Sequence, residues 1–535
     1  MQTEVTAAAR RTPLLGRGQT WMTQQTRDGW IDAGLLFISI LPLLLTTHLP
    51  LADLQNHLAR QYVLRDWAHS PVLQAIYQIR WALVPNLALD LFVLVVRPVI
   101  SLDTAVRLFC IATVALLFVG TMLVNRTLSR GTGRAYRVVP LLCYGGPFQM
   151  GFLSYCFGAG LALLWFGCYL RLRACPRPGV AALLVVWGFT TLACHMAAFG
   201  LFALSVGGCE LAAAFAAVDG RLRHRWRLAA GGIIWGLVLP VGCLAGVLIL
   251  FMLLGPPASH NAAVNAASAV VQFDVLRGKV RAVYAITGFS SPVLEGGLLI
   301  LASAGLGVAL AGGTLRFNAA GAVGVVVMLA AWLVLPDVAG GAAYIDYRIP
   351  WAVSFFALAS LVPAGRQNGL RRALGFYGIA LAAARIASIC AFWLTWEPAL
   401  AEIDRALGSL PLGTRLYVVE GELPGGRPFR QPELNQVASY VVARRYGFEP
   451  GMFVSFPGQI LDFQPRYERM WTDAGFGGTL PSTLDRVPPD YDAVLVLLPS
   501  YARLSPGLPL RCITHGRLFE LYQVTRGQPP VHCGS

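Results

Sequence analysis

The sequence has little charge for its length. Only 13% of the 535 residues are charged and 56% are hydrophobic, a composition that excludes a water-soluble chain of this size. Lysine and arginine outnumber the acidic residues by 42 to 27. They occur in short clusters between apolar segments, however, as in the cytoplasmic loops of membrane proteins. The composition therefore predicts a polytopic membrane protein, surrounded by membrane lipids and without a nucleic-acid partner.

Several signatures are also absent. The 11 cysteines include no C-x-x-C pair and no zinc-ligand spacing, so those in apolar segments are expected to be small buried hydrophobes. Cys512 and Cys533 lie in the polar C-terminal region. They are either free thiols or, if that region faces an oxidising compartment, joined in a disulfide. No internal repeat is present, which disfavours inverted-repeat transporter folds. No small-residue cleavage site follows the first apolar segment, which predicts a retained signal anchor.

About eleven apolar segments approach the roughly 20 residues needed to cross a bilayer core of about 30 Å. They lie near residues 31–49, 103–124, 138–150, 152–171, 179–195, 197–217, 229–254, 294–313, 317–335, 349–363 and 373–395. If residues 1–30 are a cytoplasmic N-terminal segment, every predicted internal loop carries arginine, in agreement with the positive-inside rule. The arginines of those loops include Arg126, Arg134, Arg137, Arg171, Arg173, Arg316, Arg371 and Arg372.

The same orientation places two long loops, 50–102 and 255–293, and the C-terminal region on the outer side. After residue 396 the composition becomes that of a soluble domain. Four short strands are predicted at 415–420, 452–455, 491–498 and 518–524, and a helix at 435–445. The predicted fold class is therefore an α-helical polytopic membrane protein with a transmembrane domain at 31–395 and a small extracytoplasmic α/β domain at 396–535.

Polar side chains are densest just after the first predicted span, in the segment Pro50–Arg60. Helical spacing puts Asp53 and His57 on one face as an i, i+4 pair, with Asn56 and Arg60 on a neighbouring row. An acid beside an imidazole can act as a general base or hold a divalent cation. Asp53, which follows Pro50 by three residues, can instead cap a helix. The residue pattern leaves these alternatives open.

Other candidates lie near predicted membrane boundaries on the outer side. Arg348 precedes Pro350 at the start of a span, where its guanidinium could bind a phosphate bidentately or pair with Asp346. Arg80 is a further basic residue on that side. His195 ends the fifth predicted span. An ionisable residue at that position can either contact a substrate or have a purely structural role.

Four motifs resemble those of a known superfamily. They are P-L-x-D-x-x-N-H-L-A-R (50–60), W-x-x-V-P-N-L-A-x-D (81–90), G-F-L-S-Y-x-F-G (151–158) and D-x-R-x-P (346–350). With the long first outer loop and the C-terminal α/β domain, they resemble the GT-C membrane glycosyltransferases, in particular an uncharacterised bacterial branch. The resemblance implies transfer of a sugar from a polyprenyl-phosphate donor to a glycan, lipid or protein acceptor at the outer face of the inner membrane.

The resemblance also implies roles for individual residues. Asp53 would be the base that deprotonates the acceptor hydroxyl for an inverting attack, or a metal partner. Many members have paired acids in this loop, whereas here Leu54 follows Asp53, so His57 would replace the second acid in holding Mg²⁺ or Mn²⁺. A transporter or lipid flippase, and a non-catalytic scaffold for envelope assembly, are the alternative functions. The residues expected to contact substrate or lipid phosphate are Arg60, Arg348, Asn56, Arg80, His195 and Asp346.

Overall fold

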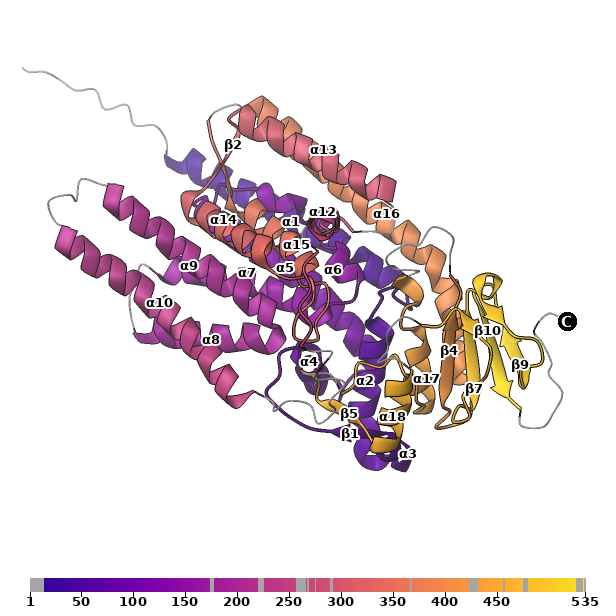
Figure 1. Ribbon diagram of the computed structural model, residues 1–535. Coiled ribbons are helices and arrows are strands. Elements are labelled where there is room, and N and C mark those ends of the chain that lie inside the picture. Colours follow the sequence, from indigo (N-terminus) through magenta and orange to yellow (C-terminus); the bar gives the residue numbers. More distant parts are fainter. Residues whose placement is uncertain are drawn as a thin grey trace, which may run out of the picture.

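The chain forms a bundle of long helices with a small sheet at one end (Figure 1). The computed structural model describes residues 14–173, 178–219, 226–255, 266, 269–274, 276–288, 292–365, 368–422, 432–455, 458–474, 480–525 and 533. Within this part of the chain, six helices are long and apolar enough to cross a membrane. The apolar stretches of those helices are Asp28–Leu45, Leu102–Leu128, Leu153–Leu172, Met196–Ala216, Val293–Ala311 and Gly369–Gly408.

The helices of the bundle lie over most of the predicted spans. In chain order they are α1 (Leu14–Leu45), α5 (Leu102–Leu128), α7 (Leu153–Leu172), α8 (Pro178–Cys194), α9 (Met196–Asp219), α10 (Trp226–Leu254), α13 (Pro292–Ala311), α14 (Ala319–Val334), α15 (Ile345–Ser360) and α16 (Asn368–Gly408). Shorter elements lie in the two predicted outer loops. They are α2 (Leu54–Asp66), η1 (Trp67–His69), α3 (Pro71–Ile76), β1 (Tyr77–Ile79), α4 (Ala88–Val96) and α12 (Arg277–Tyr284).

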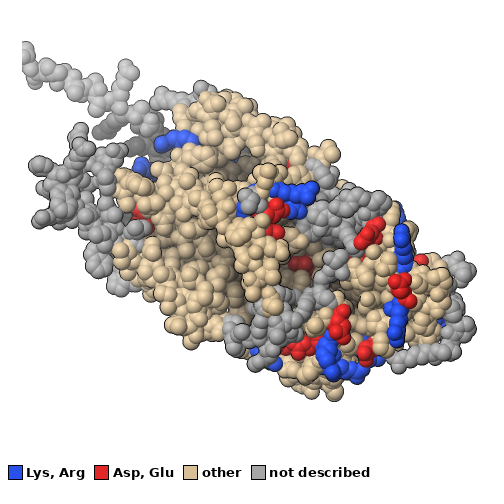
Figure 2. Space-filling view, viewed as in Figure 1, with Lys and Arg blue, Asp and Glu red and all other residues tan. Residues whose placement is uncertain are grey.

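Small residues bring two central helices, α5 and α7, close together. An added Cβ atom on Gly120 would lie 2.8 Å from Leu163 Cβ, and one on Gly160 would lie 2.8 Å from Leu116 Cβ. Helices inside a membrane gain from such close approach because lipid chains compete with any looser apolar contact. The third motif, which begins α7, is therefore held in the middle of the bundle. On the face shown in Figure 2 the bundle surface is mostly uncharged, and charged side chains gather toward the C-terminal region.

The prediction of a helical span at 138–150 is wrong. This segment consists of a 3-10 helix, η2 (Ala135–Leu141), and one four-residue helix, α6 (Gly146–Gln149). Pro140 and Pro147 each remove a backbone donor and disfavour a continuous helix here. Irregular backbone can exist at membrane depth only where protein surrounds it, and the side chains of Tyr136, Val139 and Tyr144 are indeed fully buried.

The segment still runs alongside α1 from Asp28 onward. Near its start, Arg137 forms an ion pair with Asp28 of α1. At its end, the carbonyl of Gln149 accepts a hydrogen bond from the Ala52 backbone, just beyond the other end of α1. We call these the Asp28 end and the Asp53 end of the bundle. The loops before and after this segment therefore lie at opposite ends of the bundle.

Arginines from the first predicted internal loop gather at the Asp28 end. Arg126 and Arg137 form ion pairs with Asp32, while Arg134 and Arg137 form ion pairs with Asp28. The bonds of 2.5 to 2.9 Å hold α1, α5 and η2 together at this end. A basic cluster of this kind is typical of the cytoplasmic end of membrane helices.

The C-terminal region contains a four-stranded sheet in the order β4-β7-β10-β9. The strands are β4 (Leu416–Glu420), β7 (Ala493–Leu497), β10 (Phe519–Val524) and β9 (Leu510–His515). Strands β4 and β7 are parallel and the other pairs are antiparallel. The other elements are η4 (Pro432–Leu434), η5 (Val437–Ser439), α17 (Tyr440–Arg445), β5 (Leu461–Phe463), α18 (Pro465–Asp473), β6 (Thr483–Leu484), η6 (Pro499–Tyr501) and β8 (Arg503–Leu504).

Three of the four predicted strands, at 415–420, 491–498 and 518–524, are confirmed as β4, β7 and β10. The strand predicted at 452–455 is wrong, because Ser455 has a φ of 62° and leaves the extended region. Only the later part of the helix predicted at 435–445 is an α-helix, α17, which η5 precedes.

The C-terminal region packs on the first long loop. Helix α16 continues past residue 396 to Gly408, and β1 of the loop pairs with β5 of the C-terminal region (Figure 1). Asn56 of α2 donates to the side chain of Gln436 and the carbonyl of Gly451 and accepts from the Phe453 backbone. One hydrophobic core extends through both parts. The Asp53 end of the bundle thus carries the C-terminal region.

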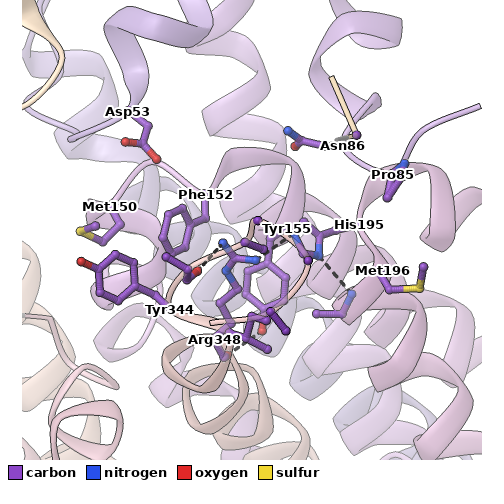
Figure 3. A pocket seen from close by; sticks show the side chains of 18 of the residues that line it. Asp53, Pro85, Asn86, Met150, Phe152, Tyr155, His195, Met196, Tyr344 and Arg348 are labelled. Carbon is purple, nitrogen blue, oxygen red and sulfur yellow. Dashed lines mark hydrogen bonds between the residues drawn. The ribbon is translucent and has the colours of Figure 1, made fainter. Parts of the chain in front are cut away.

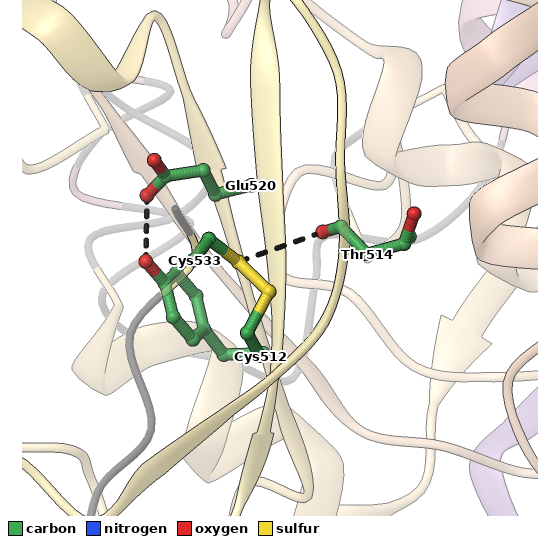
Figure 4. The surroundings of a disulfide bond; sticks show 5 residues. Cys512, Thr514, Glu520 and Cys533 are labelled. Carbon is green, nitrogen blue, oxygen red and sulfur yellow. Dashed lines mark hydrogen bonds between the residues drawn. A yellow bond between two sulfur atoms is a disulfide. The ribbon is translucent and has the colours of Figure 1, made fainter. Parts of the chain in front are cut away.

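A disulfide joins Cys512 of β9 to Cys533, with the two Cα atoms 5.1 Å apart (Figure 4). It fastens the last described residue to the outer strand of the sheet. The described cysteines of the bundle are free thiols, and Cys110, Cys143 and Cys156 are among those that are fully buried. This agrees with their predicted role as small apolar side chains.

Candidate active site

A cavity of about 1350 Å³ lies at the Asp53 end, between the bundle and the C-terminal region. Its wall is formed by parts of α7, α9, α14 and α15, by the first long loop and by residues near β4. All four sequence motifs contribute to it, although they are separated by up to three hundred residues of chain. The motif residues on the wall include Asp53, His57, Pro85, Asn86, Phe152, Tyr155, Arg348 and Ile349.

Asp53 occupies the residue before α2, but its side chain makes no capping hydrogen bond. The structure therefore does not support the helix-cap interpretation. Within the described residues its carboxylate has no hydrogen bond or ion pair, and the residue is only 7% exposed. Burial raises the pKa of Asp53 to about 7, and the charge of Arg348 acts in the opposite direction. A buried carboxylate near neutral pKa is suited to accept a proton.

The third motif shapes the turn at Asp53. Gly151 has a φ of 78°, and an added Cβ atom there would lie 2.8 Å from the Asp53 backbone nitrogen. Its carbonyl oxygen lies 3.2 Å from Nε2 of His57, which therefore donates to it. Burial, with Arg60 nearby, lowers the pKa of His57 to about 4. His57 is thus a neutral residue that ties the first motif to the third rather than a hydrogen-bonded partner of the Asp53 carboxylate.

Arg348 lies on the cavity wall without a carboxylate partner in the described residues. Its guanidinium stacks over the Phe152 ring, 4.3 Å from the ring centre, and Nη2 donates to the Ala343 carbonyl at 3.2 Å. Tyr155 donates to the Arg348 backbone carbonyl and fixes the first turn of α15. Figure 3 shows Arg348 beside Phe152 and Tyr155, with Asp53 on a separate segment of the wall. This arrangement holds a cation in a fixed position facing the cavity.

His195 joins α8 to α9 and faces Arg348. Its Nδ1 accepts a hydrogen bond from the Ala197 backbone at 3.0 Å. Nε2 of His195 lies within hydrogen-bonding distance of Nη1 of Arg348, at 3.0 Å. The imidazole and the Ala343 carbonyl therefore hold the guanidinium of Arg348 in a fixed position on the cavity wall.

The second motif positions the other motifs. Asn86 has a φ of 93°, and its backbone nitrogen donates to the carbonyls of Ala193 and Cys194, directly before His195. Asp90 binds Arg60 through both carboxylate oxygens, at 2.5 and 3.1 Å. The motif therefore supports His195 on one side and α2 on the other.

Four predicted site residues lie outside the cavity wall. Arg60 is bound by Asp90 and also donates to Gln459. Asn56 is occupied by the C-terminal region, as described above. Their predicted contacts with substrate stay predictions, and the contacts in the structure are those of residues that hold the wall in place.

The other two are Arg80 and Asp346. Arg80 forms an ion pair with Asp462 at 3.1 Å and its side chain is 52% exposed. Asp346 is fully buried beside Lys279 at 3.5 Å, so it does not pair with Arg348. Asp346 lies at the base of the 336–345 loop, of which several residues form part of the cavity wall.

The sequence interpretation assigned no site role to the wall residues from the C-terminal region. Glu420 ends β4 and is 5% exposed, and Asn435, Gln436 and Gln459 lie near it on the wall. A signal for Glu420 existed: it stands at the carboxyl end of a strand whose neighbour β7 is parallel, and ligands commonly bind at that edge of a sheet.

The predicted Mg²⁺ or Mn²⁺ site has few side-chain ligands. Within the described residues, no three His, Cys, Asp or Glu side chains lie close enough together to hold a metal ion. Asp53 and His57 would provide two ligands at most, and Nε2 of His57 is directed at Gly151. The donor set therefore does not fit a cation held by described side chains alone, and no step below uses one.

The helices and the cavity define a polytopic membrane protein with a polar site at one end of its helical bundle. No protein-family model and no curated protein matches this chain. Among solved structures, the chain is similar to ArnT from Cupriavidus metallidurans bound to undecaprenyl phosphate. The similarity covers 93% of this chain and 98% of that chain, with 12% sequence identity and a TM-score of 0.48.

Proposed function

We propose that this chain is a GT-C-type glycosyltransferase of the bacterial inner membrane. It transfers a sugar from a polyprenyl-phosphate donor to a hydroxyl group of a glycan, lipid or protein acceptor on the outer face. One observation carries the proposal: Asp53 and Arg348 face the same cavity, and neither has an oppositely charged partner within 4.0 Å among the described residues. A free base and a free cation are the two groups that transfer from a lipid phosphate requires.

In the proposed reaction, the Asp53 carboxylate accepts the proton of the acceptor hydroxyl. The acceptor oxygen forms a bond to the anomeric carbon of the sugar, and the bond between that carbon and the phosphate oxygen breaks. The bonding electrons stay with the polyprenyl phosphate, whose added negative charge is stabilised by Arg348. Attack from the side opposite the leaving phosphate inverts the anomeric configuration.

The fixed position of Arg348 supports this role. Its guanidinium already contacts Phe152, His195 and the Ala343 carbonyl. Donors that are in place before the reaction stabilise developing charge without a cost of reorganisation. The effect is largest where water is excluded.

Two observations support an outer location of the site. The Cys512–Cys533 disulfide belongs to the C-terminal region, and disulfides are typical of oxidising compartments such as the periplasm. The paired arginines lie at the opposite, Asp28 end, which is typical of the cytoplasmic side. We therefore place the Asp53 end at the periplasmic face.

The test is an Asp53→Asn variant, assayed in membranes for sugar transfer from polyprenyl-phosphate sugars. Loss of the base is expected to lower the turnover by roughly 10²- to 10⁴-fold. The matched control is Asp66→Asn at the end of α2, where the carboxylate bonds to Arg65 and Tyr446 and is not on the cavity wall. Turnover equal to wild type in Asp53→Asn would contradict the proposal. Movement of the donor across the membrane without cleavage would instead identify a flippase.

A further inference from the structure

Two glutamine side chains on the cavity wall are held by the first sequence motif. Gln436 and Gln459 belong to the C-terminal region and lie on the wall, whereas their partners on α2, Asn56 and Arg60, do not. Asn56 donates to the side-chain oxygen of Gln436 at 3.2 Å, and Arg60 donates to the side-chain oxygen of Gln459. The proposed reaction uses neither glutamine.

The orientation of each amide follows from its partner. The side-chain oxygen of Asn56 accepts a hydrogen bond from the backbone nitrogen of Phe453, which can only donate. The NH₂ group of Asn56 therefore faces Gln436, and Gln436 must present its oxygen to it. An arginine side chain has no acceptor, so Gln459 must likewise present its oxygen to Arg60.

The two amides therefore keep their NH₂ groups for the cavity. The oxygen and the nitrogen of an amide point in different directions from the same carbon, and both oxygens point toward α2. Within the described residues, neither the Gln436 nor the Gln459 nitrogen has a hydrogen-bond acceptor. Polar groups in such a place bond to water or to a ligand. The wall thus presents two fixed groups of donors.

The surrounding wall has a composition that suits a carbohydrate. Asn435 adds a further amide, and Glu420 adds a buried carboxylate, a group that accepts hydrogen bonds. Phe453 adds an aromatic ring, whose centre lies 6.3 Å from that of the His57 ring. Sugar hydroxyl groups both donate and accept, and the C–H face of a sugar packs on an aromatic ring. A lipid chain against the same wall would leave its polar groups unpaired.

This part of the wall adjoins the base and not the cation. Asn56 lies in the first turn of α2, just after Asp53. The contacts of the Arg348 guanidinium come instead from Phe152, His195 and the 336–345 loop, on a separate segment of the wall (Figure 3). A sugar held by the two glutamines would therefore lie on the side of the carboxylate that accepts the proton. In the proposed reaction that is the side of the acceptor.

We propose that the NH₂ groups of Gln436 and Gln459 form a binding site for the acceptor, and that this acceptor is a carbohydrate. The inference rests on the proposed function and deepens it, because it selects a glycan among the acceptors that this function allows. Asn56 and Arg60 are positioning residues, which hold the two amides by their oxygens without touching the acceptor.

Methionine is a suitable replacement for each glutamine, because it is unbranched, similar in size and without a donor. Gln436→Met and Gln459→Met each remove one NH₂ group from the wall. Asn56→Asp tests the positioning role. It keeps the oxygen that accepts from Phe453 but removes the donor, so the Gln436 amide is expected to turn its nitrogen toward α2 and away from the cavity.

Gln78→Met is the matched control. Gln78 of β1 donates to Gln464 at 2.9 Å, so it also joins the first long loop to the C-terminal region, where β1 pairs with β5. It is not part of the cavity wall. The control therefore breaks a similar bond between the same two regions and leaves the proposed site unchanged.

The experiment measures the affinity of the full-length protein in nanodiscs for soluble and lipid probes. The soluble probes are chitotriose, maltotriose, mannotriose and the tripeptide glycyl-seryl-glycine, and the lipid is a polyprenyl phosphate of eleven isoprene units. The wild type is expected to bind at least one trisaccharide roughly tenfold more tightly than the tripeptide. Gln436→Met, Gln459→Met and Asn56→Asp are each expected to weaken binding of that trisaccharide about tenfold.

Binding of the polyprenyl phosphate separates a role in the site from a role in the fold. The three variants are expected to bind it within about twofold of the wild type, because its phosphate lies at Arg348, whereas damage to the whole wall would weaken both ligands. Gln78→Met is expected to bind every probe as the wild type does.

Each failure has its own signature. If no trisaccharide binds the wild type, or if the tripeptide binds as tightly, the carbohydrate inference is overturned while the proposed function stands. If the variants bind the trisaccharide normally, or lose the polyprenyl phosphate to the same extent, the glutamines only support the wall and the inference is also wrong. If the wild type binds no polyprenyl phosphate, the proposed function fails, and trisaccharide binding that depends on Gln436 and Gln459 would still show a carbohydrate site.

Discussion

Two regions of this protein bury charged side chains in opposite ways. In the cavity, Asp53 and Arg348 influence each other electrostatically but form no ion pair. Between α13 and α16, by contrast, Glu295 and Arg385 form a direct pair at 3.0 Å, with both side chains at most 1% exposed. Arg385 donates further to the Tyr144 carbonyl. Each charge of the pair between α13 and α16 has an oppositely charged partner, and within the described residues the charges of the cavity have none.

This difference distinguishes charged residues that stabilise the fold from charged residues whose partner is not part of the described chain. An unpaired buried charge costs free energy in the empty protein, so its presence calls for a partner that the chain does not supply. Arg60 and Asp90 resemble the Glu295–Arg385 pair, although their helices adjoin the cavity. Closeness to the cavity is therefore a weaker guide to function than the absence of a partner.

The largest expected effect is the loss of stability when the Glu295–Arg385 pair is broken. Arg385→Met leaves Glu295 buried without its cation, and is expected to lower the free energy of unfolding by about 3–5 kcal/mol. Thermal unfolding of the purified protein in detergent measures the loss. The double variant Glu295→Leu/Arg385→Met removes both charges and should recover most of the stability. If the single variant is as stable as wild type, the proposed contrast between the two regions is wrong.

The second effect is on the cavity. Arg348→Gln removes an unpaired cation, so unfolding should change little, whereas kcat/KM for sugar transfer is expected to fall roughly 10²- to 10³-fold. The control is Arg466→Gln, because Arg466 is an exposed arginine of α18 that pairs with Asp490. Normal activity in Arg348→Gln, or a large loss of stability, would show that Arg348 stabilises the fold as Arg385 does and does not act in the reaction.

The third effect is a pH dependence that only the cavity should show. In the proposed reaction Asp53 must be ionised to accept the proton, and burial raises the pKa of Asp53 to about 7. Activity should therefore rise about tenfold per pH unit up to pH 7 and then level off. A pH profile of kcat/KM that is flat between pH 5 and 8 would contradict this assignment.

The same pKa shift predicts the sign of a stability effect. The folded protein keeps a proton on Asp53 that the unfolded chain releases above the ordinary pKa of 3.8. Asp53 therefore destabilises the fold progressively as the pH rises from about 4 to 7. Asp53→Asn removes this cost, so its melting temperature should exceed that of wild type at pH 8 and equal it near pH 4.

The long helices were predictable because a membrane-spanning helix is recognised from the hydropathy of consecutive residues in the sequence. That signal failed at 138–150, where the apolar residues are buried in protein but Pro140 and Pro147 interrupt the helix. The cavity residues Asp53, Arg348 and His195 were also predictable, since polar groups next to apolar spans are conspicuous.

The partners of other candidates were not predictable. Asn56 bonds to Gln436, 380 residues further along the chain, and Arg60 bonds to Asp90 across a loop. Nothing in the neighbourhood of either residue in the sequence distinguishes it from a ligand-binding residue. The same limit applies to Glu420, whose place on the cavity wall depends on how the C-terminal region packs against the bundle.

The smallest expected effect is that of removing divalent cations. Turnover should stay within about twofold of its starting value in EDTA, because Asp53 and His57 are too few ligands and Nε2 of His57 is already bonded to the Gly151 carbonyl. The measurement is the transfer rate before and after chelation and after addition of Mg²⁺ or Mn²⁺. A loss of turnover that either ion reverses would identify Asp53 as a metal ligand. Its carboxylate would then bind a cation in addition to accepting a proton.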